Sequence, residues 1–305
     1  MKSRSTSLRF LAAILSILLA PLCGCVQLVP PDYETSVKTG GEIEATFLAR
    51  GQYEVERAEI DAPAPMDKYS IYFPSVLKDS DQKFPVVVYL NGTGMKASYY
   101  PALFNHLASW GFVVLGNEDP GTGTGKSADQ TLGFILDENE REGSVFYGKI
   151  DRDAIGIYGH SQGGAGVFNA ITANERSSLY KTAVSLSPAS EPGAARMKYP
   201  YDSSKVAIPI LILAGDGDLF ETKVVIPLEE LNKTYDRIAS PKAVARKKGQ
   251  RHAQTFYAAD GYVTAWFMAR LQNDEQAAKA FEGESPEIIS NPLYRDQRVD
   301  LEARR

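Results

Sequence analysis

The residues that decide the fold are Ala-Ile-Gly-Ile-Tyr-Gly-His-Ser-Gln-Gly-Gly at positions 154–164. The stretch begins as an apolar run typical of a buried strand, contains Gly-x-Ser-x-Gly, and continues into a helical pattern over residues 162–173. A strand, a sharp turn and a helix in this order lift a serine side chain above the edge of a sheet. We therefore expect Ser161 to present its hydroxyl there, with the N–H of Gln162 at a helix start, where it can donate to a developing oxyanion.

Strand-like and helical segments alternate along the chain on both sides of this stretch. Strands are expected at residues 53–60, 69–73, 84–90, 112–116, 154–158, 182–186 and 208–214 and near 240–246. Helices are expected near 103–110, within 126–143, and at 162–173, 221–236 and 263–271. The alternation predicts an α/β fold with a mostly parallel central sheet and helices on both faces. The short segment 191–205 leaves no room for a large lid.

A serine hydroxyl is a poor nucleophile unless a base removes its proton, so the site requires a histidine. The chain has three histidines. His160 is adjacent to the serine in sequence and its side chain should diverge from it. His106 lies in a predicted helix and is interpreted as a surface or boundary residue. His252 follows the last predicted parallel strand in a loop, and by elimination and chain order it is the expected base.

The expected carboxylate lies in Ala-Gly-Asp-Gly-Asp at residues 214–218, directly after a predicted strand. An Asp at this place can accept a hydrogen bond from the histidine and fix its tautomer. Asp218 is the favoured acid, because Asp216 can instead form a turn with the glycine that follows it. Glu221 is the next candidate. The order Ser, Asp, His along the chain is that of the α/β-hydrolase fold.

A second backbone donor to an oxyanion is expected in Leu-Asn-Gly-Thr-Gly at residues 90–94, the loop after an earlier central strand. The N–H of Thr93 is the favoured donor, with that of Gly94 as an alternative. The simpler interpretation of the same residues is an ordinary glycine turn. A site of this kind needs no metal and no cofactor, and none is expected.

The Gly-rich sequence Asp-Pro-Gly-Thr-Gly-Thr-Gly-Lys-Ser at residues 119–127 ends like a phosphate-binding loop. Pro120 stands where that loop needs its first glycine, and proline there removes one N–H donor and fixes φ. A nucleotide site is therefore not favoured. Because the segment leaves the carboxyl end of a predicted strand, where α/β folds place their sites, we expect it to form a mobile wall of a substrate cleft.

Residues from about 65 to 272 resemble bacterial α/β-hydrolases that group with dienelactone hydrolases and cutinase-like polyester hydrolases. The resemblance rests on Gly-Lys-Ile-Asp at 148–151, Gly-His-Ser-Gln-Gly-Gly at 159–164, Pro-Tyr-Asp-Ser-Ser at 200–204 and Gly-x-x-Asp at 215–218. It implies that Asp218 is the catalytic acid and that Tyr201 brings an aromatic ring to the substrate cleft. The family carries an aromatic residue where this chain has Thr93, and Met where it has Gln162. These departures argue against cleavage of aromatic polyesters but leave ester hydrolysis intact.

The N-terminus has the pattern of a signal peptide, with basic residues before the apolar stretch Phe10–Leu22, which is short for a transmembrane helix. Leu-Cys-Gly-Cys at residues 22–25 resembles the bacterial lipobox, although its second position is usually a small residue. The resemblance implies that Cys25 is lipidated and becomes the first mature residue; the alternative is a secreted protein cut near the same place. Both cysteines lie in this segment, so the mature domain has no disulfide.

The composition fits a globular enzyme: of 305 residues 44% are hydrophobic and 23% charged, and the net charge of −5 argues against nucleic-acid binding.

We expect a signal peptide at 1–24, a tether at 25–45, an α/β-hydrolase domain at 46–290 and a tail at 291–305. The expected protein is extracytoplasmic and membrane-anchored, and hydrolyses small or polymeric carboxylic esters through an acyl-enzyme. An amidase or acyltransferase could use the same triad, and a non-catalytic binding lipoprotein is the alternative from another class. The sequence does not predict the oligomeric state.

Overall fold

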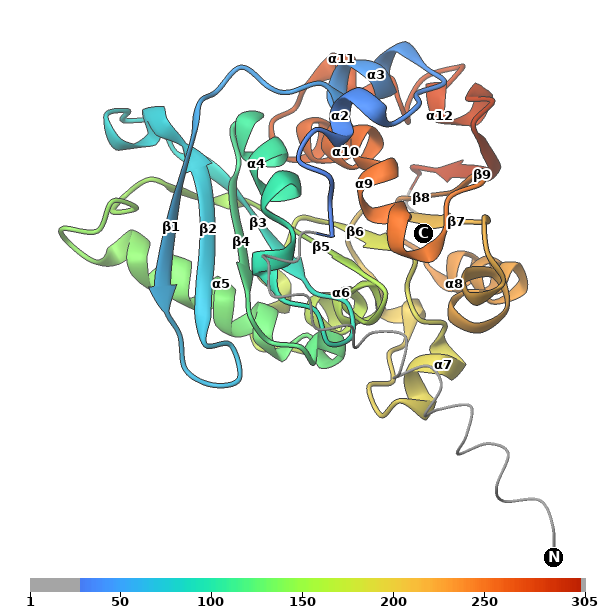
Figure 1. Cartoon of the computed structure of the whole chain (residues 1–305), viewed down its shortest axis with the longest axis horizontal. Helices are drawn as coiled ribbons and strands as arrows, with labels where there is room; N and C mark the ends of the chain where they lie inside the picture. The colour runs from blue at the N-terminus through green and yellow to red at the C-terminus, as the bar shows by residue number, and fades with distance from the viewer. Residues whose placement is uncertain (1–27, 303–305) are drawn as a thin grey trace, which may run out of the picture.

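The computed structural model describes residues 28–302. The strands are β1 (Val55–Asp61), β2 (Lys68–Pro74), β3 (Phe84–Leu90), β4 (Val113–Asn117), β5 (Ile150–His160), β6 (Thr182–Leu186), β7 (Ile210–Gly215), β8 (Lys242–Lys247) and β9 (Tyr294–Asp300). Within the described range they form one nine-stranded sheet in the order β1-β2-β4-β3-β5-β6-β7-β8-β9 (Figure 1). The apolar run of β3 lies between β4 and β5, which explains why every one of its residues is buried.

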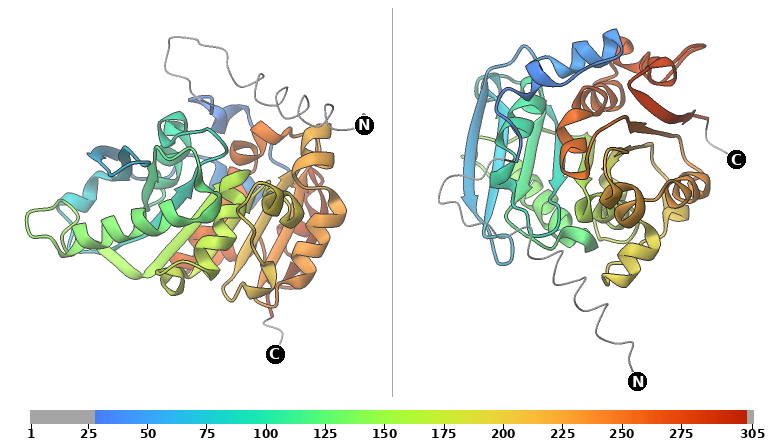
Figure 2. Two further views of the ribbon diagram at one scale, coloured as in Figure 1. Left: turned by 90° about the horizontal axis from the view of Figure 1, so that it is seen from below. Right: turned by 45° about the vertical axis from the view of Figure 1, so that its right-hand side comes forward.

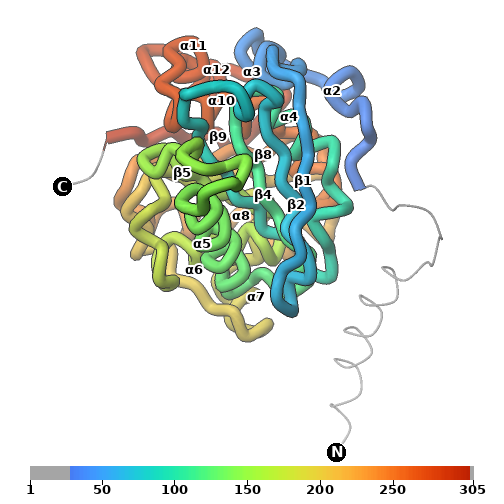
Figure 3. Tube along the Cα trace, turned by 90° about the vertical axis from the view of Figure 1, so that its left-hand side faces the viewer, coloured from blue at the N-terminus to red at the C-terminus, as the bar shows by residue number. Residues whose placement is uncertain are grey.

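The strands from β4 to β8 run parallel, and antiparallel strands close the two edges of the sheet. β1 and β2 form a hairpin that pairs with β4, and β9 pairs with β8. Figure 3, which faces the β1 edge, shows helices on both sides of the sheet. This arrangement confirms the predicted α/β-hydrolase fold, and it brings the carboxyl ends of the parallel strands to a common edge.

Helices form a layer on each face of the sheet (Figure 2). One layer contains α5 (Lys126–Glu140), α6 (Gln162–Thr172) and α8 (Leu228–Arg237), and the other contains α3 (Glu42–Leu48), α4 (Pro101–Ser109) and α10 (Asp260–Leu271). Successive residues of β3 alternate between the two layers: Val86 and Val88 pack with the first, and Val87 and Tyr89 with the second. Both faces of the sheet are therefore apolar, as a parallel sheet requires.

Where the structure describes them, both predicted end segments belong to the folded domain, so the predicted domain limits need correction. The expected tether was 25–45, but residues 28–45 contain α2 (Tyr33–Ser36) and the first part of α3, and Val29 and Tyr33 are fully buried. Residues 294–300, expected as a tail, form β9. The polar sequence of β9 conceals a strand because its side chains are mostly half-exposed at the edge of the sheet.

The remaining helices are short: α7 (Glu191–Arg196), α9 (Thr255–Ala258), α11 (Glu275–Ala278) and α12 (Glu287–Ser290). The helix predicted at 221–236 is divided into a π-helical turn over Phe220–Val225 and α8, with Pro227 between them. The segment 191–205 holds α7 and one 3₁₀ turn and forms no large lid. None of the helices in residues 28–302 is long and apolar enough to cross a membrane.

Candidate active site

Ser161 lies in a strained turn between β5 and α6. Its φ of 61° and ψ of −117° are unusual for a residue with a side chain, and such strain is typical of a nucleophile elbow. Its N–H donates to the carbonyl of Leu186 over 2.9 Å, which fixes the turn to β6. Two residues on, a Cβ at Gly163 would lie only 2.1 Å from the carbonyl oxygen of Leu90. Glycine is therefore required for α6 to begin directly against the end of β3.

His252 approaches Ser161 from the loop after β8. Its Nε2 lies 2.9 Å from the Ser161 Oγ, within hydrogen-bonding distance. It opens a short 3₁₀ turn, His252–Gln254, and its side chain is 12% exposed, so that most of the ring is buried. The structure thus brings together the serine and the histidine that the sequence selected.

The carboxylate that meets the histidine ring is Glu221, not Asp218. Glu221 Oε2 lies 2.6 Å from Nδ1 of His252. The Asp218 side chain instead accepts hydrogen bonds from two backbone N–H groups, those of Glu221 (2.6 Å) and His252 (3.1 Å). The prediction that Asp218 orients the imidazole is corrected by this geometry.

The π-helical turn explains why Glu221, and not Asp218, contacts the histidine ring. Asp218 precedes it and accepts from the N–H three residues ahead, as a capping residue does at a helix start. Its carboxylate is then no longer available to the ring, while the turn carries Glu221 inward. Glu221 is completely buried, and its Oε1 accepts from the hydroxyl of Ser187 (2.5 Å) and the N–H of Gly215 (2.9 Å). A buried carboxylate held by three hydrogen bonds is well placed to orient a histidine.

Asp216 contributes to the same site from further away. It accepts a hydrogen bond from the N–H of Gly249 over 2.6 Å and lies 3.2 Å from the Arg295 guanidinium. The first contact holds the loop that leads from β8 to His252, and the second ties it to β9. Asp216 therefore fixes a loop and does not contact the ring.

His160 is a site residue that sequence reasoning missed. Its ring packs against that of His252, with centroids 4.5 Å apart, and its Nε2–H donates to the His252 carbonyl over 2.9 Å. Burial, together with the neighbouring His252, holds the pKa of His160 well below its ordinary value, so the ring is neutral. Its adjacency to Ser161 was the available signal. His160 positions the backbone that carries the base.

His106, the third histidine, is buried rather than at the surface. Its Nδ1 lies 2.7 Å from Asp260 and its Nε2 3.0 Å from the carbonyl of Ala49. Tyr33 also donates to the Asp260 carboxylate. These contacts join α2, α4 and α10 and have no part in the serine site.

The two expected oxyanion donors lie on segments that pack together. The N–H groups of Thr93 and Gln162 have no acceptor among residues 28–302, so both are free to donate to a ligand. The contact between Gly163 and the Leu90 carbonyl places the start of α6 against the loop that carries Thr93. An oxyanion hole built from these two N–H groups is therefore sterically consistent with the fold.

Exposed apolar side chains stand on the π-helical turn and directly before it, and one of them contacts the histidine. Leu219, Phe220 and Val224 are 74%, 41% and 51% exposed, and the Phe220 ring meets the His252 ring edge-on at 5.2 Å. Because Glu221 points inward from the same turn, its neighbours face outward. An exposed apolar ring beside a reactive group favours a substrate with an apolar part.

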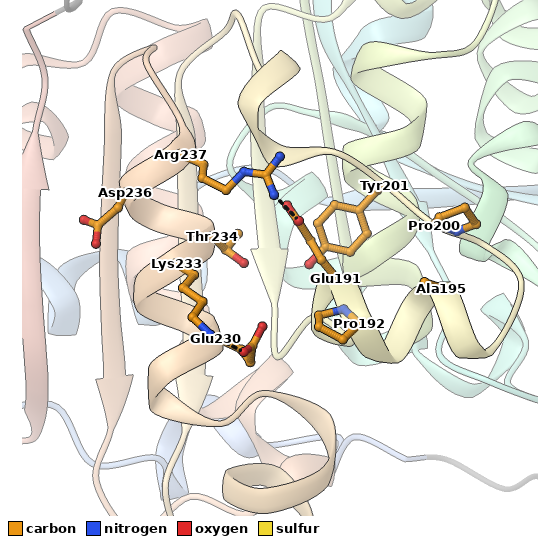
Figure 4. Close-up of a pocket in the computed structure, with 10 residues that line it drawn as sticks. All are labelled: Glu191, Pro192, Ala195, Pro200, Tyr201, Glu230, Lys233, Thr234, Asp236 and Arg237. Carbon is orange, nitrogen blue, oxygen red and sulfur yellow. Dashed lines mark hydrogen bonds and ion pairs between the residues drawn. The ribbon is translucent and has the colours of Figure 1, made fainter.

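Tyr201 packs inward, away from the role that the resemblance implied. Its ring stacks on Phe168 at 4.5 Å and its hydroxyl donates to the carbonyl of Ala189 over 3.0 Å. Figure 4 shows Tyr201 in a surface hollow between α7 and α8, where Arg237 pairs with Glu191. The described contacts of Tyr201 include none with the serine, histidine or glutamate of the site.

A serine in an elbow, hydrogen-bonded through a histidine to a buried carboxylate, defines the chain as an α/β-hydrolase with a Ser-His-Glu constellation. Comparison with known proteins gives the family. Residues 34–292 match the family of PET hydrolase-like proteins, and the chain belongs to that family.

A curated relative is the bis(hydroxyethyl) terephthalate hydrolase of Streptomyces coelicolor. It is 33% identical over 186 residues, which cover 59% of this chain and 54% of the relative. The match thus spans about half the length of that protein. The resemblance to polyester hydrolases is confirmed by the family match.

Proposed function

We propose that this protein hydrolyses carboxylic esters through an acyl-enzyme on Ser161. The proposal rests on a chain of two hydrogen-bonding contacts, one from the Ser161 Oγ to His252 (2.9 Å) and one from His252 to Glu221 (2.6 Å). A structural role alone would not require a strained serine to face a histidine held by a buried carboxylate.

The reaction proceeds in two displacements. The Ser161 Oγ attacks the ester carbonyl carbon while His252 accepts the hydroxyl proton, and the carbonyl oxygen becomes an oxyanion that the N–H groups of Thr93 and Gln162 stabilise. When the tetrahedral intermediate collapses, His252 returns the proton to the departing alcohol. A water molecule, deprotonated by the same histidine, then attacks the acyl-enzyme, and the acid product and free serine are released.

Glu221 keeps the imidazole in the tautomer that has Nδ1–H toward the carboxylate and Nε2 toward the serine. Its own three hydrogen bonds fix its orientation, because Ser187 and Gly215 occupy Oε1 and leave Oε2 for His252. The carboxylate also stabilises the imidazolium that forms when the serine proton is transferred. Asp218 and His160 hold the backbone of this histidine and do not touch its reacting nitrogen.

The substrates we propose are small aromatic diesters of the terephthalate type. The family match and the named activity of the relative support this class, as does the exposed Phe220 ring beside His252. Thr93 and Gln162 give little aromatic surface to clamp a polymer chain, which favours soluble esters over a solid polyester.

The test is release of the monoester from bis(hydroxyethyl) terephthalate, measured by liquid chromatography. Ser161→Ala should lower kcat by about 10⁶-fold, as removal of a triad serine does. Ser178→Ala, which removes an exposed serine, is the matched control and should leave turnover unchanged. Retention of more than a small fraction of kcat by folded Ser161→Ala would reject the mechanism. Turnover of p-nitrophenyl acetate but not of the terephthalate ester would reject only the substrate class.

We further propose that the protein is an extracytoplasmic lipoprotein anchored through Cys25. This residue lies outside the described part of the chain, so the proposal rests on the lipobox-like sequence at residues 22–25. The substrate would then be hydrolysed outside the cytoplasm.

A further inference from the structure

The loop between β4 and α5, residues 118–125, contains most of the Gly-rich sequence and is bonded to the loop that carries Thr93. Gly94 N–H donates to the carbonyl of Pro120 over 3.0 Å, and the Thr122 hydroxyl donates to the carbonyl of Asn91 over 2.6 Å. These contacts lie immediately before and after the Gly92-Thr93 dipeptide. We expected this loop to form a mobile wall of the substrate cleft. These hydrogen bonds instead hold it against the loop that carries Thr93.

Asn91 fastens the two loops from the other direction. It is fully buried, and its Nδ2 donates to the carbonyls of Asn117 (2.7 Å) and Asp119 (2.9 Å). The Gly-rich loop is held in turn by the side chain of Asn117, which donates to Thr131 over 2.8 Å on α5. The residue before Gly92 thus uses both its side chain and its carbonyl to contact this loop.

The same Gly-rich loop also packs on α6, the helix whose first residue is Gln162. Asn169 of α6 donates to the carbonyl of Gly123 over 2.9 Å. A Cβ at Gly166 would lie 2.4 Å from the carbonyl oxygen of Thr122, so the loop touches the helix backbone directly. One loop therefore holds both segments that supply the expected oxyanion donors.

We propose that Asn91 and Thr122 are positioning residues of the oxyanion hole. Through them the Gly-rich loop sets the distance between the N–H groups of Thr93 and Gln162, so that both can reach one oxygen atom. The inference rests on the proposed ester hydrolysis. It gives Asn91 and Thr122 a role beyond the contacts of Ser161, His252 and Glu221.

Positioning of this kind should act on the transition state. Backbone donors that are already oriented stabilise an oxyanion without reorganisation, and that charge exists only after the serine has attacked. A loosened donor should therefore lower kcat and leave KM nearly unchanged. The loss should be smaller than the 10²–10³-fold loss that follows removal of a donor itself, and we expect it to be about tenfold.

The experiment compares Thr122→Val, which removes the hydroxyl bonded to Asn91, with Thr122→Ser, which restores a hydroxyl. Thr124→Val, the same substitution at an exposed position of the loop, is the matched control. We expect kcat for p-nitrophenyl acetate to fall about tenfold in Thr122→Val, with KM and the pH profile unchanged. Thr122→Ser should recover most of the loss, and Thr124→Val should match the wild type. Inhibition by phenylboronic acid, which forms a tetrahedral adduct on a serine, should weaken in parallel with kcat.

Each variant is assayed well below its own unfolding temperature, so that a loss of stability is not read as a loss of kcat. If Thr122→Val melts too low, Asn91→Asp, which replaces the amide donor by a carboxylate facing two carbonyls, gives the same readout. Normal kcat and boronate affinity in a folded Thr122→Val protein would overturn the inference, as would an equal loss in Thr122→Ser. Activity in Ser161→Ala would overturn the proposed function instead, so the two failures are distinguishable.

Discussion

At the scale of single residues, three carboxylates after β7 fix the position of one histidine in different ways. Glu221 contacts the ring, Asp218 the backbone N–H, and Asp216 the loop that leads to it. Chemically similar side chains a few residues apart thus have separate tasks. Their backbone conformations, not their residue types, decide which one meets Nδ1.

This division predicts an order among the variants. Glu221→Gln should lower kcat for a soluble ester by about 10⁴-fold, because an amide can present its NH₂ to Nδ1 and favour the wrong tautomer. Asp218→Asn should cost about tenfold, since Asn keeps one acceptor but turns an NH₂ toward a backbone N–H. Glu229→Gln, an exposed residue of α8, is the matched control and should have no effect. Steady-state kinetics on proteins with native circular dichroism give the comparison.

A larger loss in Asp218→Asn than in Glu221→Gln would restore Asp218 as the acid. Such a result would also mean that the π-helical turn rearranges when substrate binds. Equal losses would indicate that the two carboxylates act as one unit, which the separate contacts of their oxygen atoms do not predict.

The sequence sufficed for the serine and the histidine but not for the acid. Ser161 is fixed by a local motif in a local strand–turn–helix context, and His252 follows because the other two histidines occupy helical or adjacent positions. The acid depends on a π-helical turn, which has no simple sequence pattern, and on the competing use of Asp218 as a cap. His160 was missed because its neighbour His252 is distant in sequence and close only in the fold.

At the scale of elements, a buried ion pair fastens helices from distant parts of the chain. Asp260, at the start of α10, lies against His106 of α4 and accepts from Tyr33 of α2. Both nitrogens of the His106 ring lie near oxygen atoms, Nδ1 at 2.7 Å from Asp260 and Nε2 at 3.0 Å from the carbonyl of Ala49, an arrangement that favours the protonated ring. Burial by itself would lower the pKa of His106, but the charge and contact of Asp260 and the carbonyl of Ala49 outweigh it and raise that pKa.

The sign of the pH dependence follows from this raised pKa. Above about pH 6.5 the unfolded chain loses the His106 proton while the folded protein keeps it, so the native state binds more protons and stability falls as pH rises. We expect the urea midpoint to decrease from pH 6.5 until the pH passes the folded-state pKa. His106→Gln should remove that part of the decrease.

The control for this prediction is His160→Gln. The pKa of His160 is lowered in the folded state, so this histidine changes stability only at pH values below about 6.5. Above that pH it should not affect the urea midpoint. An unchanged slope above pH 6.5 in His106→Gln would show that the pair with Asp260 does not hold the proton.

Some helices and strands could be predicted from the sequence and others could not. The central strands were predictable because continuous apolar runs must be buried on both faces. α2, α3 and β9 were not, since they are short or polar, and what holds them is tertiary: Tyr33 reaches Asp260, and Glu44 of α3 pairs with Lys247 of β8 at 2.8 Å. No local periodicity encodes such contacts.

At the scale of the whole molecule, the fold begins close to the proposed anchor. The N–H of Leu28 already donates to the carbonyl of Tyr99 over 3.0 Å, only three positions after Cys25. Residues 28–45 are part of the domain, so a lipidated Cys25 would hold the hydrolase against the membrane rather than on a long tether.

The anchoring proposal predicts that the wild-type protein partitions into the detergent phase while Cys25→Ser remains aqueous or unprocessed. Stable anchoring needs more than one acyl chain, so mass spectrometry should find a diacylated or triacylated mature N-terminus. Cys23→Ser is the matched control and should still be lipidated. A mature wild-type species in the aqueous phase, with cleavage at another residue, would refute the anchor and favour the secreted alternative.

The central claim, an acyl-enzyme on Ser161, is tested most directly by acid-quenching the protein during turnover of bis(hydroxyethyl) terephthalate and digesting it with trypsin. Cleavage after Arg152 and Arg176 gives a peptide in which Ser161 is the sole serine. We predict a terephthaloyl monoester on that peptide, fragmenting to Ser161, formed after ethylene glycol has left and absent from Ser161→Ala. Steady turnover with that peptide unmodified, or an adduct on another residue, would contradict the mechanism.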